Sequence, residues 1–254
     1  MDFFASFNGL LWFVLMLLPL VLLQRLLHRE IQAVILIATR HPALTMGLFS
    51  ALFFPGVLLH ELSHFVMARL LGVRTGGFSL IPRATADGRL QLGYVETQRT
   101  DAVRDSLIGA APLIAGGLFV AYAAVYRLSL LPLWEFLRNG QFNLFFLGLS
   151  ALPDVKDFWL WFYLTFAVSS TMLPSASDRH AWLPLGVWVG GLFLLALLVG
   201  AGPWMLANVA PPLDAFLQSV ATLFGLSAAV HGLLILPVFL IHKFLARLTH
   251  VDVT

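Results

Sequence analysis

Apolar residues occur along this chain in long, nearly uninterrupted stretches that short polar segments separate. Six stretches approach or exceed the ~20 residues that a helix needs to cross a bilayer. They predict membrane spans at Leu10–Leu27, Ala43–Leu71, Asp105–Leu128, Phe158–Leu173, Leu183–Leu206 and Phe216–Ile241. The pattern therefore predicts an all-α, multi-pass membrane protein whose residues 1–254 form a single integral membrane domain.

Two shorter apolar pieces and the first long one need a separate interpretation. Ile31–Ala38 and Phe142–Leu152 are too short to cross a bilayer and are expected to be interfacial or re-entrant. The run Leu10–Leu27 is too long for the core of a signal peptide and lacks a charged segment before it. We therefore interpret it as a retained span.

The longest polar segment, Gly72–Thr100, carries the pattern of a strand rather than of a helix. From Leu90 to Tyr94, large apolar residues alternate with polar or small ones, which is the two-residue period of a β-strand. Asp87-Gly88 is a pair typical of hairpin turns. We therefore expect a small β-hairpin over Gly77–Thr97 at the membrane surface, with an irregular loop as the alternative.

The composition agrees with the membrane interpretation and excludes several functions. The chain is 59% hydrophobic and 11% charged, whereas a soluble domain of this length is far more polar. Its 15 Lys and Arg are spread among loops and exceed the 13 Asp and Glu by only two, so no nucleic-acid surface is expected. The absence of cysteine excludes disulfides, thiolate metal ligands and a cysteine nucleophile.

The positive charges suggest an orientation for the predicted spans. When the hairpin segment is placed in the cytoplasm, six alternating spans put nine Lys and Arg residues on that side and six on the other. The positive-inside rule then favours both termini in the cytoplasm.

A cluster of ionisable residues lies inside the second predicted span. His60, Glu61 and His64 form the pattern H-E-x-x-H in the stretch FFPGVLLHELSHFVMARLLG. Residues four apart share one face of a helix, so the two imidazoles can reach one zinc ion while the glutamate takes a proton from a water. Ionisable groups inside a membrane are costly and usually functional, so a polar cluster without metal is the less favoured interpretation.

A catalytic zinc ion takes three protein ligands and leaves a fourth position open, so a third ligand is expected elsewhere. The polar run Ser169–Thr171 lies in the fourth predicted span, Pro174 then breaks the helix, and Asp178 follows. Asp178 is the leading candidate, with a solvated or salt-bridged carboxylate as the alternative. His180 and His231 are reserves, and His231 is interpreted first as a histidine bonded to a neighbouring helix.

The segment LIGAAPLIAGG, Leu107–Gly117, is rich in glycine and alanine. Small residues let membrane helices approach closely, so we expect a packing face here. Pro112 within this segment would free a backbone carbonyl. A share in shaping the substrate entry is the second interpretation.

Taken in order, these segments resemble the site-2 protease family of intramembrane zinc metalloproteases. The resemblance rests on HELSH inside a span, the insert that begins LLGVRTGGFSL, the segment IGAAPLIAGG and the segment TMLPSASD. It covers Leu44 to about Trp182 and implies a catalytic core at about 43–182. The spans at 10–27, 183–206 and 216–241 carry no specific signature and are interpreted as accessory.

The resemblance implies a core of three helices and a set of site residues. It implies that His60 and His64 bind zinc, that Asp178 is the third ligand and that Glu61 is the general base. It also implies cleavage of substrate transmembrane segments near the cytoplasmic side of the membrane.

The chain departs from the family pattern around these residues. The asparagine of the third-ligand motif aligns with Thr171, and Asp178 lies four residues after Pro174, one closer than usual, with no glycine after it. The asparagine expected after the Gly-Pro segment, which corresponds to Pro112, is absent. Thr171, Pro174 and Pro112 are therefore expected to support the substrate or the structure in a divergent member of the family.

The expected function is hydrolysis of peptide bonds within or near transmembrane segments of membrane-protein substrates in the lipid bilayer, with zinc as cofactor. The hairpin is expected to add an extended strand of substrate to its edge. The alternatives are a non-enzymatic zinc-binding membrane protein, such as a sensor or transporter, and a degenerate protease that acts as a scaffold. The insert and the tails are too short for a separate recognition domain, so substrate selection is expected to come from the membrane domain or from a partner.

Overall fold

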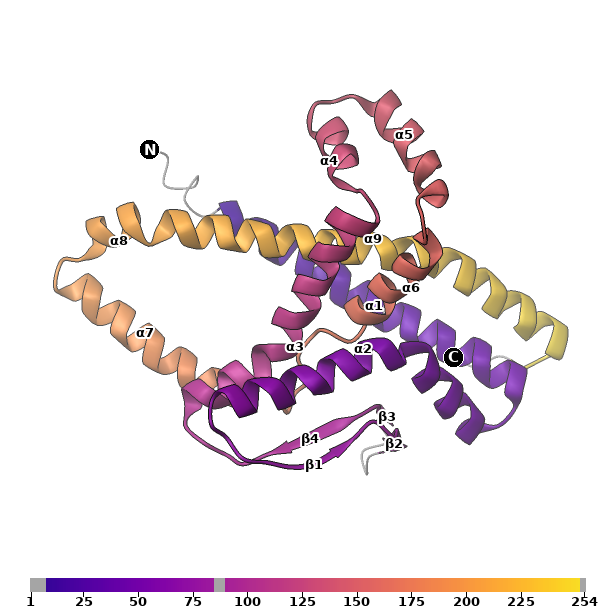
Figure 1. Cartoon of the computed structure of the whole chain (residues 1–254), viewed down its shortest axis with the longest axis horizontal. Helices are drawn as coiled ribbons and strands as arrows, with labels where there is room; N and C mark the ends of the chain where they lie inside the picture. The colour runs from indigo at the N-terminus through magenta and orange to yellow at the C-terminus, as the bar shows by residue number, and fades with distance from the viewer. Residues whose placement is uncertain (1–7, 85–89, 252–254) are drawn as a thin grey trace.

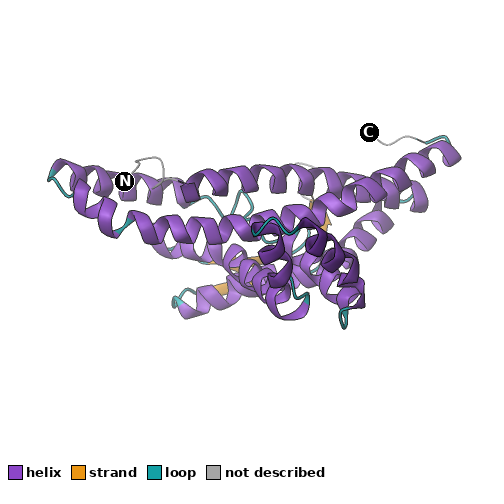
Figure 2. Cartoon of the chain, turned by 90° about the horizontal axis from the view of Figure 1, so that it is seen from above, coloured by secondary structure: helices purple, strands orange, loops and turns teal. Residues whose placement is uncertain are grey.

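The chain folds mainly into long apolar helices, shown by a computed structural model that describes residues 8–84 and 90–251 (Figure 1). The helices are α1 (Asn8–Thr39), α2 (Pro42–Leu70), α3 (Ala102–Tyr122) with a π-helical turn after it (Ala123–Arg127), α4 (Leu131–Arg138), α5 (Phe142–Ala151) with a 3₁₀ turn after it (Leu152–Asp154), α6 (Phe158–Ser169), α7 (Trp182–Leu198), α8 (Gly202–Asn208) and α9 (Ala210–Thr249). Helix makes up most of the molecule, and the strands form only a small patch (Figure 2).

Four of the described helices are long and apolar enough to cross a membrane, namely α1, α2, α3 with its π-helical turn, and α9. The helices α7 and α8 together have the required length but are bent by 117° at the break between them. Helix α6 is apolar but has only 12 residues. The prediction of a multi-pass, largely helical membrane protein is therefore confirmed, whereas the count of six spans is not.

Helix α1 joins two segments that the sequence pattern separates. Leu10–Leu27 and Ile31–Ala38 belong to one uninterrupted helix, so the second piece is not a separate re-entrant segment. Its continuity has a physical reason, because the charge of Glu30 is paired inside the protein. Glu30 Oε2 lies 2.5 Å from His242 Nδ1 of α9, and both side chains are almost fully buried.

The predicted span Leu183–Leu206 is also wrong as a continuous helix. Gly200 has a φ of +83°, a left-handed conformation that glycine adopts without steric cost and that ends a helix. Pro203 then lies in the first turn of α8, where its missing N–H is not needed. Together the two residues fix the sharp bend between α7 and α8.

The predicted hairpin is present. Strand β1 (Thr75–Ser79) pairs antiparallel with β4 (Tyr94–Thr97), and β2 (Arg83–Ala84) pairs antiparallel with β3 (Leu90–Gln91). The predicted turn at Asp87-Gly88 lies outside the described residues. Figure 1 shows the strands running alongside α2, which places the hairpin next to the H-E-x-x-H motif.

Helices α1 and α9 run parallel and form the most extensive helix pair of the described structure. The first residues of α1 lie beside the first turns of α9, since the N–H of Gly9 donates to Asp214 Oδ1 at 2.5 Å. Further along, the rings of Phe13 and Phe224 are 5.5 Å apart. At the far end, Glu30 of α1 reaches His242 of α9. The first and sixth of six alternating spans would instead be antiparallel.

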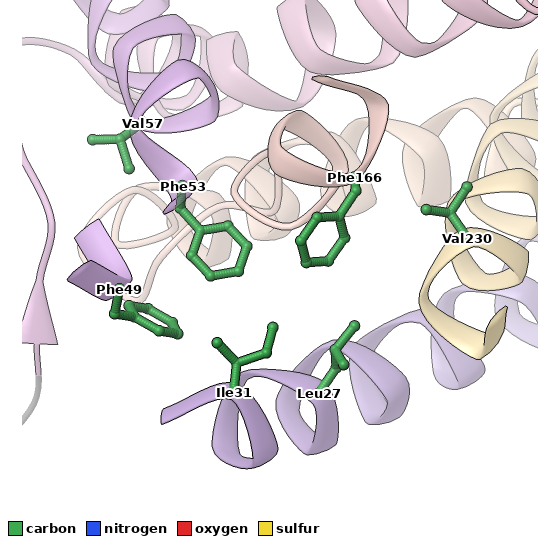
Figure 3. Close-up of a cluster of buried hydrophobic side chains, with 7 residues drawn as sticks. All are labelled: Leu27, Ile31, Phe49, Phe53, Val57, Phe166 and Val230. Atoms are coloured by element: carbon green, nitrogen blue, oxygen red, sulfur yellow. The ribbon is translucent and has the colours of Figure 1, made fainter. Parts of the chain in front are cut away.

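A cluster of buried hydrophobic side chains joins α1, α2, α6 and α9. Figure 3 shows its members converging from these helices: Leu27, Ile31, Phe49, Phe53, Val57, Phe166 and Val230. Phe53 is fully buried, and its ring centroid lies 5.3 Å from that of Phe166. Gly56 lets the same two helices approach closely, because a Cβ there would overlap the carbonyl of Ala167. This core fixes α2 against α6 one turn before His60.

Candidate metal centre

Helix α2 presents both histidines of the motif on one face. The Nε2 atoms of His60 and His64 lie 3.2 Å apart, as expected for residues separated by one helical turn. His64 and Glu61 are buried, and His60 is partly buried. The four-residue spacing in the sequence thus places two imidazole nitrogens so that they face a common point.

The loop between α6 and α7 brings Asp178 to this point. Asp178 Oδ1 lies 3.3 Å from His64 Nε2, and Oδ2 lies 3.7 Å from His60 Nε2. One ligand atom from each of the three residues lies within 4.8 Å of the others. Two atoms bound to one tetrahedral zinc at about 2.0–2.2 Å are about 3.3–3.6 Å apart, so the spacing of the three atoms fits a shared metal ion.

Each histidine is oriented by a backbone carbonyl on its other ring nitrogen. His60 Nδ1 lies 2.7 Å from the oxygen of Thr171, and His64 Nδ1 lies 2.8 Å from the oxygen of Ile108. A carbonyl oxygen only accepts, so each Nδ1 carries a hydrogen, and in the neutral ring Nε2 has a lone pair that a metal ion can bind. Metal-binding histidines use this arrangement.

Asp178 is held as a charged carboxylate. Its Oδ2 accepts a hydrogen bond of 2.7 Å from the N–H of Ser175. Burial alone would raise the pKa of this carboxyl, but the neighbouring imidazoles of His60 and His64 and the bond from Ser175 outweigh burial and hold the pKa well below its usual range. Together, the two histidines and the carboxylate can hold a metal ion.

Glu61 lines a cavity of about 890 Å³ beside the three ligand atoms. The walls come from α2, the hairpin, the start of α3 and the loop after α6. Gly93 of the hairpin lies directly against Glu61, since a Cβ at residue 93 would come within 3.0 Å of Glu61 Oε1. A buried carboxylate next to a metal position and open to a cavity can accept a proton from a water or a substrate group.

The two reserve ligands do not join the three ligand atoms. His180 Nε2 is 3.4 Å from Asp105 Oδ2, and His180 Nδ1 is 2.7 Å from the oxygen of Ser177. His231 is fully buried. Its Nδ1 donates to the backbone oxygen of Ser227 at 2.7 Å, and its Nε2 lies 2.9 Å from Ser170 Oγ. The structure therefore agrees with the interpretation of His231 as a histidine bonded to a neighbouring helix.

The supporting residues named from the sequence lie in the elements that form the candidate centre. The carbonyl of Thr171 orients His60, and its side-chain hydroxyl donates back to the carbonyl of Ala167 at 3.2 Å. Helix α6 ends at Ser169, before Pro174, which leaves an irregular loop that carries Asp178. Pro112 is fully buried in the middle of α3.

Two functional positions were missed by the sequence reasoning. Ser175 orients Asp178 through its backbone N–H, a role that any residue except proline can fill and that therefore leaves no trace in the sequence. Gly93 had a readable signal, because a glycine inside a strand pattern often marks the close approach of another group.

Comparison of the chain with protein-family models, with curated proteins and with solved structures finds no match. The function is therefore inferred from the geometry of the His60–His64–Asp178 group and of Glu61.

Proposed function

We propose that this protein is an intramembrane zinc metalloprotease that hydrolyses peptide bonds within or near transmembrane segments of membrane-protein substrates. The observation that carries the proposal is the convergence of His60, His64 and Asp178 on one point beside the buried carboxylate of Glu61. Three protein ligands leave a fourth position for a reacting group, which is the arrangement of catalytic rather than structural zinc.

Zinc in this position would supply Lewis-acid chemistry, activating a water and polarising the peptide carbonyl. The chain's own contribution is proton transfer and orientation. Glu61 accepts the proton of the attacking water and delivers it to the leaving amine. The carbonyls of Thr171 and Ile108 hold the two imidazoles, and the N–H of Ser175 holds the Asp178 carboxylate.

The hairpin offers a way to present the substrate backbone. Residues 91–95 and Thr97 line the cavity. One edge of β4 pairs with β1, and within the described residues its other edge has no partner strand. A transmembrane helix buries its carbonyls in backbone hydrogen bonds, so a substrate has to unwind before attack. An unwound segment can then add to the edge of β4 as an extended strand.

The resemblance to the site-2 protease family supports the same proposal. The segments that carry it, HELSH, IGAAPLIAGG and TMLPSASD, come together around one point, with His64 bonded to Ile108 and Asp178 placed against Gly109. A Cβ at residue 109 would overlap the carbonyl of Asp178. The tight packing expected of the small residues in α3 thus brings the third ligand to the histidines.

The packing directions support five membrane crossings, by α1, α2, α3, α9 and the segment that runs from α6 to the loop carrying Asp178. Helix α6 follows α3 in the opposite direction, because Trp161 stacks on Phe119 while Asp178 reaches Gly109 near the start of α3. The next helix, α7, starts on the hairpin side, where His180 meets Asp105. Since α9 starts beside the start of α1, the bent pair α7–α8 enters and leaves the membrane on the hairpin side.

Five crossings change the charge argument. Lys243 and Arg247, at the end of α9, then lie on the side opposite the hairpin. The hairpin side therefore has seven Lys and Arg residues instead of nine, and the opposite side has eight instead of six. Assignment of the hairpin side to the cytoplasm then rests on the family resemblance alone. His64 lies six residues before the end of α2 at Leu70, about 9 Å of helix, so the proposed metal lies nearer the hairpin side.

The proposal is tested with the purified protein in liposomes and a panel of single-span model substrates that carry helix-weakening Gly or Pro residues. We expect zinc-dependent cleavage, and a loss of about 10²–10⁴-fold in Glu61→Gln, the range for a missing general base. Glu135→Gln, an exposed change on α4, is the matched control. A binding scaffold or a zinc sensor would hold zinc without cleaving, and would be indifferent to Glu61→Gln.

A further inference from the structure

Pro112 lies in the middle of α3, fully buried, at a position where a proline removes one specific hydrogen bond. In an α-helix each carbonyl accepts from the N–H four residues later. The partner of the Ile108 carbonyl would be the N–H of residue 112, which proline lacks. The proline ring also pushes against this carbonyl and tilts it away from the helix axis.

The released carbonyl has a single described use. His64 Nδ1 lies 2.8 Å from the Ile108 oxygen, and both residues are buried. A buried carbonyl needs a partner, and a buried imidazole needs its ring nitrogens satisfied. Because the carbonyl accepts the Nδ1 hydrogen, the lone pair of His64 Nε2 is directed at the common point with His60 and Asp178.

We infer that Pro112 is a positioning residue of the metal centre, acting through the Ile108 carbonyl on the orientation and tautomer of His64. The inference rests on the proposed role of His64 as a metal ligand. Any other residue at position 112 has an N–H that competes for the same carbonyl. The His64 ring would then turn or carry its hydrogen on Nε2, which blocks the nitrogen that faces the metal.

Other prolines inside helices provide the comparison. Pro19, Pro55 and Pro237 lie within α1, α2 and α9. Four residues before them stand Leu15, Ala51 and Leu233. Within residues 8–84 and 90–251, the carbonyls of Thr171 and Ile108 accept hydrogen bonds from the proposed ligand histidines. The carbonyls of Leu15, Ala51 and Leu233 do not. Pro237, on an exposed part of α9, is the matched control.

The first measurement is zinc affinity, by competition with a chromophoric chelator in detergent. Pro112→Ala is expected to bind zinc about 10–100-fold more weakly, the usual effect of losing a group that orients a metal-binding histidine. Pro237→Ala is expected to bind as the wild type does. Equal affinity in Pro112→Ala and wild type would overturn the inference.

A second variant separates the missing N–H from the packing of the proline ring. Replacement of Pro112 by the α-hydroxy analogue of alanine, introduced by nonsense suppression, gives an ester that has neither the ring nor the donor. We expect this variant to recover most of the wild-type zinc affinity. If the ester is as weak as Pro112→Ala, the ring matters through packing and the inference fails.

The tautomer of His64 is read directly in the zinc-free protein. Nitrogen-15 shifts of the histidine rings, assigned with His64→Gln, are expected to show Nδ1–H in the wild type and a mixture in Pro112→Ala. An unchanged tautomer would contradict the inference. This readout needs no bound metal and no substrate, so a wild type that fails to cleave would refute the proposed function and leave the role of Pro112 decided by the ring shifts.

Discussion

Glu61 of α2 and Gly93 of the hairpin are in such close contact that a Cβ at residue 93 would lie 2.8 Å from Glu61 Cγ. Real Cβ contacts are not this short, so the hairpin reaches the carboxylate only because residue 93 has no side chain. The contact ties the strand that lines the cavity to the group proposed to move the proton.

Gly93→Ala should therefore slow hydrolysis without releasing zinc. The added methyl group displaces Glu61 or the hairpin, and a misplacement of about 1 Å costs ~100-fold in rate. The change leaves His60, His64 and Asp178 untouched, so zinc content is expected to remain at the wild-type level. Cleavage of a model substrate and metal analysis of the same sample test this.

Gly47→Ala is the control for that prediction, because a Cβ at residue 47 meets nothing within 4 Å. Wild-type activity in Gly93→Ala would show that the hairpin does not hold Glu61 in its working position.

Asp178→Asn should weaken zinc binding by more than ~10–100-fold, which is the usual effect of losing a group that only hydrogen-bonds to a metal ligand. Asparagine keeps the shape of the side chain but loses the negative charge that faces the two imidazoles. His180→Ala and His231→Ala should keep their zinc, because those rings bond to Asp105 and Ser170 instead. Loss of zinc in His180→Ala together with retention in Asp178→Asn would reverse the ligand assignment.

Acid should release the metal through the imidazoles and not through the carboxylate. The pKa of Asp178 is lowered in the folded protein. The Asp178 carboxylate is therefore charged at every pH above the usual carboxyl pKa, and it loses its charge only when the pH falls below the lowered pKa. A metal-binding imidazole must be neutral. We expect the zinc dissociation constant to rise as the pH falls while the Asp178 carboxylate is still charged.

A dissociation constant that stays constant until Asp178 itself takes up a proton would contradict this expectation. Competition of zinc with a chromophoric chelator at a series of pH values measures it.

Single cysteines can be placed freely because the natural chain has none. With five crossings, Asn8→Cys and Arg74→Cys should react with an impermeant maleimide from one side of the membrane. Asn139→Cys and His250→Cys should react from the other side. Reaction of His250→Cys from the same side as Arg74→Cys would restore six crossings and contradict the parallel orientation of α1 and α9.

The candidate metal centre was largely predictable because its chemistry is local in the sequence. The four-residue spacing of His60 and His64 fixes their common face, and the polar break before Asp178 marks a loop. The contacts that orient these ligands were less accessible. His64 is bonded to a backbone carbonyl 44 residues away, and backbone groups carry no residue-specific signal.

The proposed number of crossings could not be predicted from hydropathy. Apolar length does not distinguish α7–α8, bent at Gly200, from a straight span. Apolar length also does not show that Glu30 is bonded to His242, a contact that lets α1 continue through a charged stretch. The direction of α9 relative to α1 depends on such pairs between distant segments, and a sliding average over neighbouring residues cannot detect them.

The pairing of Glu30 with His242 also constrains how the protein is made. The two residues are 212 positions apart, so α1 leaves the ribosome long before its partner in α9 exists. Before then, Glu30 has the neighbouring Arg29 guanidinium at 3.3 Å but lacks its buried partner, and a carboxylate in the bilayer is costly. Until α9 is synthesised, α1 therefore has to keep Glu30 at the membrane surface or in the shelter of the insertion machinery. Release of the finished helix pair is then coupled to the arrival of the last helix, so an incomplete chain is exposed to quality control.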